Sequence, residues 1–197
     1  MKKRDIDFLF EIGTLRKVPR AWQQVLNGKV ENIAEHIFRT ALIAWTIAKR
    51  EKADVAKVLR IALVHDLAET RATDIAFLHR DYVTRHEELA QKDIFEDTSL
   101  GDEALSLLKE YEERESLEAR IVKDADNLDV DLELRELAQN GDTSAAGMRK
   151  QHRPHVREVK LYTKTAKKMW DQIQKTGPNN WHQALTNKWI KNKRGAR

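Results

Sequence analysis

The stretch LRIALVHDLAET, residues 59–70, indicates a buried helix, and a His–Asp pair, His65 and Asp66, interrupts its apolar run. A buried carboxylate costs several kcal/mol unless a cation or strong hydrogen-bond donors compensate it, so Asp66 needs a partner elsewhere in the fold. Neighbours on a helix point about 100° apart, which disfavours a hydrogen bond within the pair. Both side chains can still reach one point beyond the helix surface, as ligands of a shared ion would.

Two further stretches supply polar groups of the same kind. AEHIFRTALIAWTIAK, residues 34–49, places His36 on the apolar side of a long helix. In RIVKDADNLDVDLEL, residues 120–134, aspartates crowd one helix at positions Asp124, Asp126, Asp129 and Asp131. Negative charges this close together destabilise the helix unless a cation neutralises them. Asp126 lies one turn from Val122, on the side of the helix that packs against the core. Two imidazoles and two carboxylates form a set suited to Mn, Fe, Co, Ni or Zn.

The rest of the chain predicts an all-α protein. A length of 197 residues fits one domain, and 7 glycines and 3 prolines are too few for the turns of a β-sandwich. Apolar residues recur at helical spacing, and we expect helices over about 5–15, 31–51, 55–70, 79–97, 101–114, 116–139, 154–175 and 181–190. We predict one compact multi-helix bundle over 1–177 and a basic C-terminal tail or short helix over 178–197.

Composition excludes several classes of protein. The chain has no cysteine, so a disulfide scaffold, a cysteine-ligated zinc and a thiol nucleophile are ruled out. It has no apolar run near the roughly 20 residues of a membrane span, and MKKRDIDFLFEIG at its start is no signal peptide, so we expect a cytoplasmic protein without a membrane partner. The net charge of +4 comes largely from residues beyond Lys175, where a solvated terminus is favoured over nucleic-acid binding.

The ordered set His36, His65–Asp66 and Asp126 resembles the HD-domain metal-dependent phosphohydrolase superfamily. AEHIFRTALIAW, ALVHDLAETRATDI and IVKDADNLD are similar to the branch that contains the bacterial 5′-deoxynucleotidases and their eukaryotic HD-domain relatives. The resemblance covers roughly residues 5–140. It implies an all-α HD-domain bundle in which His36, His65, Asp66 and Asp126 hold one divalent metal ion, with Mn, Co, Ni, Fe, Zn and Mg all open.

The same resemblance implies roles for four more residues. Glu69 would orient or deprotonate the attacking water, and Asp74 would lie near the substrate or leaving group; a solvated helix-end acid and a turn residue are the alternatives. In VPRAW, residues 18–22, Arg20 and Trp22 match an arginine and a tryptophan that contact phosphate and nucleoside. Ala21 separates them here, whereas some members have the pair adjacent, so Trp22 could equally be a core or dimer-contact aromatic.

The implied activity is that of a metal-dependent phosphomonoesterase, a 5′-nucleotidase that acts on deoxynucleoside 5′-monophosphates. The chain lacks the His–His pair of members with more metals, and His79 and His86 are expected on exposed helix surfaces. One alternative keeps the metal and changes the substrate to a nucleoside triphosphate or a cyclic nucleotide. Another is a non-catalytic metal-containing module that binds nucleic acid. Relatives are often homodimers, so the oligomeric state stays open.

Overall fold

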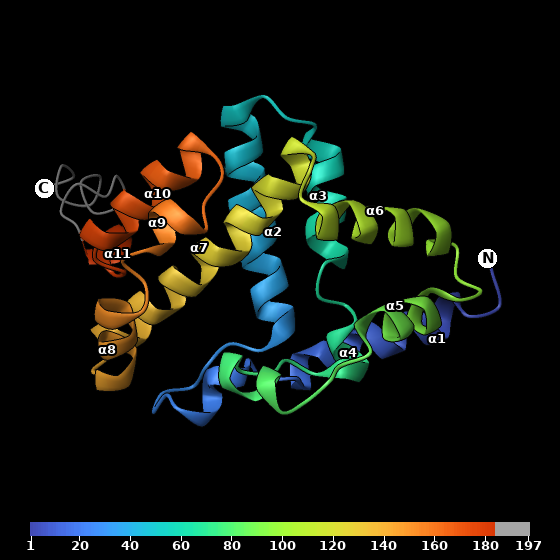
Figure 1. Cartoon of the computed structure of the whole chain (residues 1–197), viewed down its shortest axis with the longest axis horizontal. Coiled ribbons are helices and arrows are strands. Elements are labelled where there is room, and N and C mark those ends of the chain that lie inside the picture. Colours follow the sequence, from blue (N-terminus) through green and yellow to red (C-terminus); the bar gives the residue numbers. More distant parts are fainter. Residues whose placement is uncertain (184–197) are drawn as a thin grey trace, which may run out of the picture.

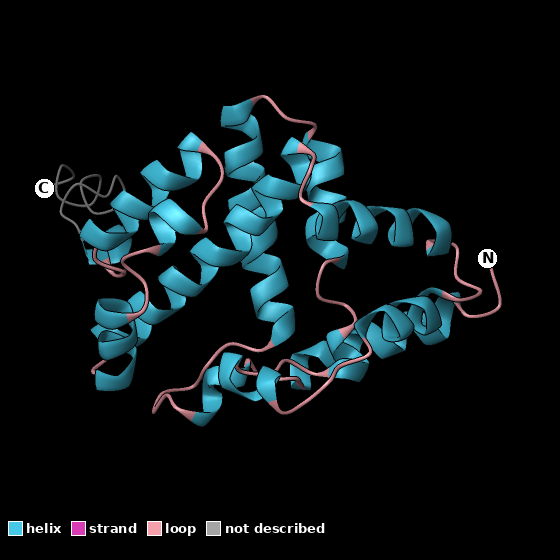
Figure 2. Cartoon of the chain, in the orientation of Figure 1, coloured by secondary structure: helices cyan, strands magenta, loops and turns pink. Residues whose placement is uncertain are grey.

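The computed structural model describes residues 1–183, which are helical apart from connecting turns and loops (Figures 1 and 2). The longer helices are α1 (Asp5–Ile12), α2 (Ile33–Glu51), α3 (Val55–Val64), α5 (Glu87–Phe95), α6 (Gly101–Glu113), α7 (Leu117–Gln139), α8 (Thr143–Gln151) and α10 (Lys164–Lys175). Single turns of α-helix are α4 (Glu69–Ala72), α9 (Val156–Val159) and α11 (Asn180–Gln183). Short 3₁₀ helices are η1 (Gly13–Lys17), η2 (Ala21–Gln24) and η3 (Phe77–Asp81). Within residues 1–183 the sole β pairing is one bridge, Pro19–Asn32, so the predicted all-α class is confirmed.

Helices α2 and α7 pack against each other at the centre of the fold, and α3 packs against both (Figure 1). Their apolar residues recur at three and four positions, so each helix buries one side. The fully buried members include Ile33, Ala44, Ile47, Ile61, Ile121, Val122 and Leu128. This packing brings the histidine of α2, the His–Asp pair after α3 and the aspartates of α7 to neighbouring positions.

The start of α2 is fixed by its sequence. Asn32 and Glu35 form a capping box, in which each side chain accepts a hydrogen bond from the other residue's backbone N–H. Just before it, the chain pairs with an earlier segment: Ile33 N–H donates to Val18 O at 2.9 Å, and Arg20 N–H donates to Glu31 O at 3.2 Å. These bonds hold the segment of Arg20 beside the first turn of α2, which carries His36.

Three predicted helices are shorter or divided in the structure. The helix expected over 55–70 ends at Val64 and continues as tighter turns. The stretch 79–97 contains the end of η3, a loop and then α5, and the stretch 5–15 passes from α1 into η1. Apolar spacing alone does not mark these ends.

The single helix predicted over 154–175 is wrong. It is divided into α9 and α10 because the buried Asp124 carboxylate of α7 accepts the backbone N–H groups of Tyr162 and Thr163, at 2.6 and 2.8 Å. Thr163 then caps α10 by accepting from Ala166 N–H. The structure also contains α8, which was not predicted and which Asp142 caps in the same way.

No helix of residues 1–183 is long and apolar enough to cross a membrane. Most of the predicted C-terminal tail, and most of the short helix expected over 181–190, lies outside the described residues. The boundary at residue 177 therefore stays a prediction.

Candidate metal centre and its cavity

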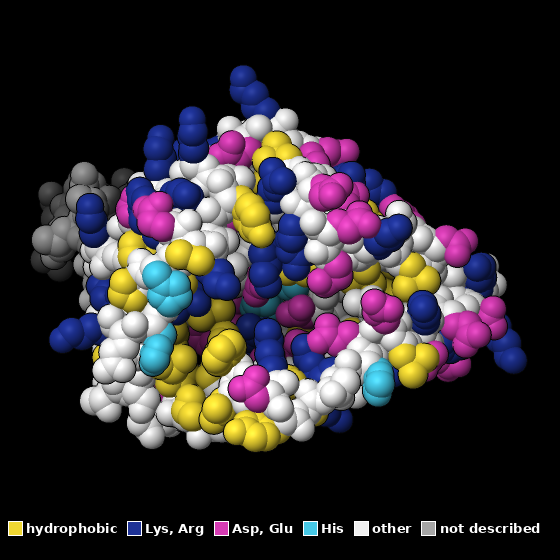
Figure 3. Space-filling model, in the orientation of Figure 1, with side chains coloured by type: hydrophobic (Ala, Val, Ile, Leu, Met, Phe, Trp, Pro, Cys, Tyr) yellow, Lys and Arg dark blue, Asp and Glu magenta, His cyan; other side chains and the backbone are white. Residues whose placement is uncertain are grey.

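A cavity of about 230 Å³ opens between α7, α6, the turn after α3 and the segment that leads into α5. Figure 3 shows the hollow in the middle of the face, with acidic and histidine side chains inside it and basic side chains at its edge. Its polar lining residues are Arg20, His65, Asp66, Glu69, Asp74, Arg80, Arg85, Glu87, Tyr111, Glu112, Arg114, Lys123 and Asp126. A lining this polar suits a charged ligand.

The four predicted metal ligands converge at one point from three helical segments. Asp66 Oδ2 lies 3.4 Å from His36 Nε2 and 3.3 Å from His65 Nε2. Asp126 Oδ1, from α7, lies 3.4 Å from His36 Nε2. Ligand atoms of His36, His65 and Asp126 all lie within 4.8 Å of one another, a spacing that could hold a metal ion.

Each histidine has its Nδ1 occupied, which directs Nε2 toward the shared point. His36 Nδ1 lies 2.6 Å from Asp129 Oδ2, and His65 Nδ1 lies 2.8 Å from the carbonyl oxygen of Ala62. A neutral imidazole that donates at Nδ1 carries its lone pair on Nε2. Both Nε2 atoms are buried and have no hydrogen-bond partner among the described residues.

The carboxylates draw positive charge to this point. Burial and Arg20 oppose protonation of His36, but the carboxylates of Asp126, Asp129 and Asp66 outweigh them and hold its pKa well above its usual value. Burial opposes ionisation of Asp66 as well, yet the two histidines keep its pKa below the ordinary range. The arrangement thus favours a cation between ionised carboxylates.

The donor set fits a divalent metal ion better than it fits mutual hydrogen bonds. Distances of 3.3 to 3.4 Å exceed those of good hydrogen bonds. Donor atoms that surround a cation at about 2.0–2.2 Å lie roughly 3.0–3.5 Å from one another. Mixed imidazole and carboxylate donors suit Mn, Fe, Co, Ni and Zn. A second possible group, Glu31, His36 and Asp129, already has a cation, because Arg39 pairs with both of its carboxylates.

A tight turn explains how the His–Asp pair and Glu69 reach one cavity. After Val64 the backbone bonds span three residues: Leu67 N–H donates to Val64 O at 3.2 Å, and Glu69 N–H donates to Asp66 O at 3.1 Å. In a helix with three residues per turn, side chains at i and i+3 lie on one side. Asp66 and Glu69 therefore both line the cavity.

Glu69 lies in the cavity with one of its oxygens unpaired. Its Oε2 has no hydrogen-bond partner among the described residues, and Oε1 lies 3.8 Å from Arg85 Nη1. Burial, and then the negative charges of Asp66 and Asp74, raise the pKa of Glu69 to about 9. Arg85 is held in turn by Glu87 and by the carbonyl oxygen of Thr73, to which it donates at 2.6 Å. A carboxyl group with such a pKa binds protons strongly for its type.

Arg20 and Asp74 lie together at the edge of the metal cluster. Arg20 is buried, with Nη1 3.6 Å from Asp66 Oδ2 and Nε 3.7 Å from Asp74 Oδ2. Asp74 also accepts the Ala21 N–H at 2.9 Å, which ties the loop after α4 to the start of η2. Both side chains line the cavity, as do the predicted ligands His65, Asp66 and Asp126.

Trp22 faces a different part of the fold. Its indole N–H donates to Glu133 Oε2 at 3.0 Å, and its ring packs against the apolar cluster that includes Leu134. The Arg20 guanidinium carbon lies 4.7 Å from the centre of the ring. Trp22 is not among the residues that line the cavity, and its predicted contact with the substrate stays a prediction.

Several residues of the site were not predicted. Arg39, Glu31 and Asp129 form the layer behind His36. Glu31 and Arg39 lie eight residues apart around the start of α2, whereas Asp129 lies on α7. The cluster of aspartates on α7 was the sequence feature that could have indicated this layer, because a buried acid needs a partner. Tyr111 and Arg114 line the cavity from the end of α6, where no motif marks them. His79 and His86 belong to neither of the two possible metal-binding groups within residues 1–183.

The sequence is similar to the HD domain family and to curated 5′-deoxynucleotidases. The HD domain family model matches residues 12–175. The 5′-deoxynucleotidase HDDC2 of Bos taurus is 34% identical over 137 residues, which cover 66% of this chain and 66% of that protein. This chain therefore spans about two thirds of the length of this curated relative.

Solved structures agree with the sequence comparison. The PH0347 protein of Pyrococcus horikoshii OT3 is 29% identical, with a TM-score of 0.71 over 86% of this chain and 98% of that one. A protein of Magnetospirillum magnetotacticum MS-1, described as a predicted metal-dependent phosphohydrolase, is 25% identical, with a TM-score of 0.62 over 85% and 90% of the two chains.

Proposed function

The chain belongs to the HD domain family, and we propose that it is a divalent-metal-dependent phosphomonoesterase that removes phosphate from deoxynucleoside 5′-monophosphates. The observation that carries this proposal is the convergence of His36, His65, Asp66 and Asp126 at the cavity, with the unpaired carboxyl group of Glu69 beside them. The substrate class is supported by the 5′-deoxynucleotidase relative, and the metal by the donor atoms themselves.

The four converging residues would hold the metal ion. His36 and His65 would bind through Nε2, because Asp129 and Ala62 O occupy the opposite ring nitrogens. Asp66 and Asp126 would supply the negative charge, and their depressed pKa values keep them ionised. A divalent ion bound there lowers the pKa of a coordinated water and offsets phosphate charge.

Glu69 would position the attacking water and accept its proton. Its carboxyl group stands three residues after Asp66 on the same side of the tight turn, and its Oε2 is free to accept a hydrogen bond. A general base works best when its pKa lies near the working pH. Burial raises the pKa of Glu69 to about 9, and added positive charge nearby would move it down toward neutrality.

Arg20 would contact the phosphoryl oxygens, and Asp74 would lie beside the sugar or leaving group. Arg20 and Asp74 pair with each other, so both side chains are already ordered before substrate binds. Substrate binding would therefore cost little side-chain conformational entropy. An arginine donates from a planar fork that matches phosphate, which favours it over a lysine for this task. The Trp22 ring lies 4.7 Å from the Arg20 guanidinium carbon and would help to fix its orientation, and we keep its contact with the nucleoside as part of this proposal.

The test is phosphate release from a panel of nucleotides. Deoxynucleoside and ribonucleoside 5′-monophosphates, a deoxynucleoside triphosphate and a cyclic nucleotide are incubated with chelator-treated protein and added Mn, Co or Mg. We expect release from the deoxynucleoside monophosphates only when metal is present. Nucleoside products are also separated by chromatography, because hydrolysis of a cyclic nucleotide gives a nucleoside monophosphate and no free phosphate. Turnover of the triphosphate or the cyclic nucleotide alone would mean that the substrate is another phosphoester.

Two variants separate the metal site from the reaction. Asp126→Ala should abolish both metal binding and turnover. His86→Ala should change neither, because His86 is exposed and does not line the cavity. If no phosphomonoester is hydrolysed and Asp126→Ala binds metal as the wild type does, the proposal fails in both parts.

A further inference from the structure

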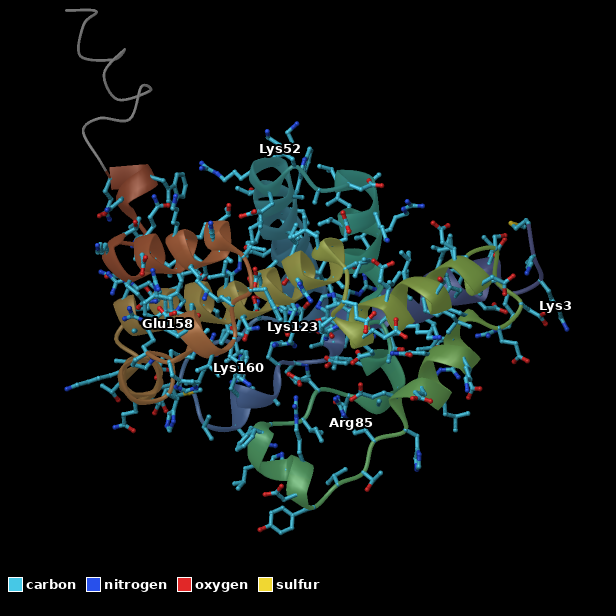
Figure 4. All side chains as sticks on the ribbon, turned by 45° about the horizontal axis from the view of Figure 1, so that its top comes forward. Lys3, Lys52, Arg85, Lys123, Glu158 and Lys160 are labelled. Atoms are coloured by element: carbon cyan, nitrogen blue, oxygen red, sulfur yellow. The ribbon has the colours of Figure 1, made fainter. Side chains whose placement is uncertain are left out.

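Several cationic side chains line the cavity beside the proposed metal ligands, and most of them already pair with a carboxylate. Arg20 lies beside Asp66 and Asp74, as described above. Lys123 Nζ donates to Asp126 Oδ2 at 2.8 Å. Arg85 pairs with Glu87 and lies near Glu69. Figure 4 shows Lys123 and Arg85 extending from different elements toward the same space.

Arg114 differs from these three residues because no carboxylate neutralises it. It lines the cavity from the residue that follows α6, and it makes no ion pair with any described residue. Its Nη1 is buried without a hydrogen-bond partner. Glu112, which also lines the cavity, makes no ion pair with Arg114 either. An unpaired guanidinium nitrogen removed from water is costly, and an anion in the cavity would relieve that cost.

Tyr111 fixes the position of this guanidinium. The Arg114 Cζ lies 3.5 Å from the centre of the Tyr111 ring, a stacking distance for a cation on an aromatic face. The same ring is buried and meets the His65 ring edge-on, with 5.5 Å between the two centres. The Tyr111 ring thus contacts both Arg114 and the proposed metal ligand His65.

Lys123 lies close to the same ring, so the two cations share one side of the cavity. Its Nζ is 6.0 Å from the centre of the Tyr111 ring. Two cations that repel each other beside a cavity, one of them without an acid partner, favour an anionic ligand between or beside them.

We propose that Arg114 binds the phosphate group of the substrate and, with Lys123, forms a second anion contact in the cavity, separate from Arg20. The inference rests on the proposed phosphoester function. A phosphate monoester carries up to two negative charges, whereas Arg20 is already offset by two carboxylates. The planar Arg114 guanidinium group, which lies over the Tyr111 ring, can offer two N–H groups to one phosphate.

Binding of inorganic phosphate, measured by calorimetry on metal-free and metal-loaded protein, tests this proposal. Arg114→Gln should weaken binding about ten- to hundredfold, as expected for loss of a charged hydrogen bond. Arg114→Lys, which keeps the charge but loses the fork, should fall between Arg114→Gln and the wild type. Arg50→Gln removes the same charge from an exposed position on α2 outside the cavity, and should leave the affinity unchanged.

Kinetics and stability distinguish binding from a structural role. Arg114→Gln should raise KM for a deoxynucleoside monophosphate more than it lowers kcat. If both Arg114 variants lower the melting temperature but bind phosphate as the wild type does, Arg114 only supports Tyr111 and the proposal is overturned. It is also overturned if the wild type binds no phosphate. If phosphate binding depends on Arg114 while no monoester is hydrolysed, the anion contact stands and the proposed function fails.

Discussion

Asp129→Asn tests how the layer behind the cavity prepares His36. Both Asp129 oxygens are occupied, since Oδ2 lies 2.6 Å from His36 Nδ1 and Oδ1 accepts from Arg39 Nε. Asparagine has a single acceptor oxygen, and Arg39 keeps its protons at any ordinary pH, so that oxygen must face Arg39. The asparagine NH₂ group then faces His36 Nδ1. The neutral imidazole would accept at Nδ1 and carry its proton on Nε2, the atom that we propose as a ligand.

The expected loss of metal affinity is about 10- to 100-fold, the usual effect of removing the partner that orients a ligating histidine. That factor corresponds to about 1.4–2.8 kcal/mol of binding free energy. The assay is competition for Mn, Co or Zn between the protein and a fluorescent chelator, with circular dichroism to confirm that the variant is folded.

Asp124→Asn is the matched control for this experiment. Asp124 lies on the same helix and is as fully buried as Asp129, but it accepts the N–H groups of Tyr162 and Thr163. Its replacement should lower the melting temperature, because one asparagine oxygen replaces two acceptors, and should leave metal affinity intact. The reasoning is refuted if Asp129→Asn binds metal as the wild type does, or if both variants lose affinity equally.

Three further outcomes follow from the site. Glu69→Gln should lower kcat about 10²–10⁴-fold while metal affinity stays near that of the wild type, as measured by single-substrate kinetics and chelator competition. Burial raises the pKa of Glu69 to about 9, so between its unfolded value of 4.5 and about 9 the fold holds a proton that the unfolded chain has released, and stability falls as pH rises. In thermal melts of metal-free protein, the melting temperature of Glu69→Gln relative to the wild type should therefore increase from pH 5 to pH 9, and a constant difference would contradict that shift. Added Mn or Zn should raise the wild-type melting temperature in proportion to the logarithm of its concentration, a shift that Asp126→Ala should lose.

The fold class and the meeting of the four proposed ligands were predictable because both depend on local patterns. His36, His65 and Asp66 stand out as polar residues within apolar helical runs, and the resemblance to a known superfamily added their order along the chain. Packing of α2 against α3 and α7 then places them together, as the structure has it.

Features that depend on long-range contacts could not be predicted. The pairing of Arg39 with Asp129 joins residues 90 positions apart, and no spacing rule connects them. The division of the 154–175 segment depends on Asp124, which captures two backbone N–H groups from a distant part of the chain. Arg114 belongs to no motif, and its place in the cavity follows from where α6 ends.

The aspartates of α7 show which property distinguishes a candidate metal ligand from a structural acid. We expected a metal cation to neutralise this cluster of aspartates, but the structure gives each acid a partner within the protein. The partners are backbone N–H groups for Asp124, Lys123 for Asp126, Arg39 for Asp129 and Arg153 for Asp131. The Asp129 and Asp131 side chains are 0% and 1% exposed, whereas those of Asp126 and Asp66 are 16% and 21% exposed and line the cavity. Density of negative charge therefore does not identify the site. Within residues 1–183 the site is identified by carboxylates that open onto a cavity beside two unpaired imidazole nitrogens, because an ion can enter there and find four donors.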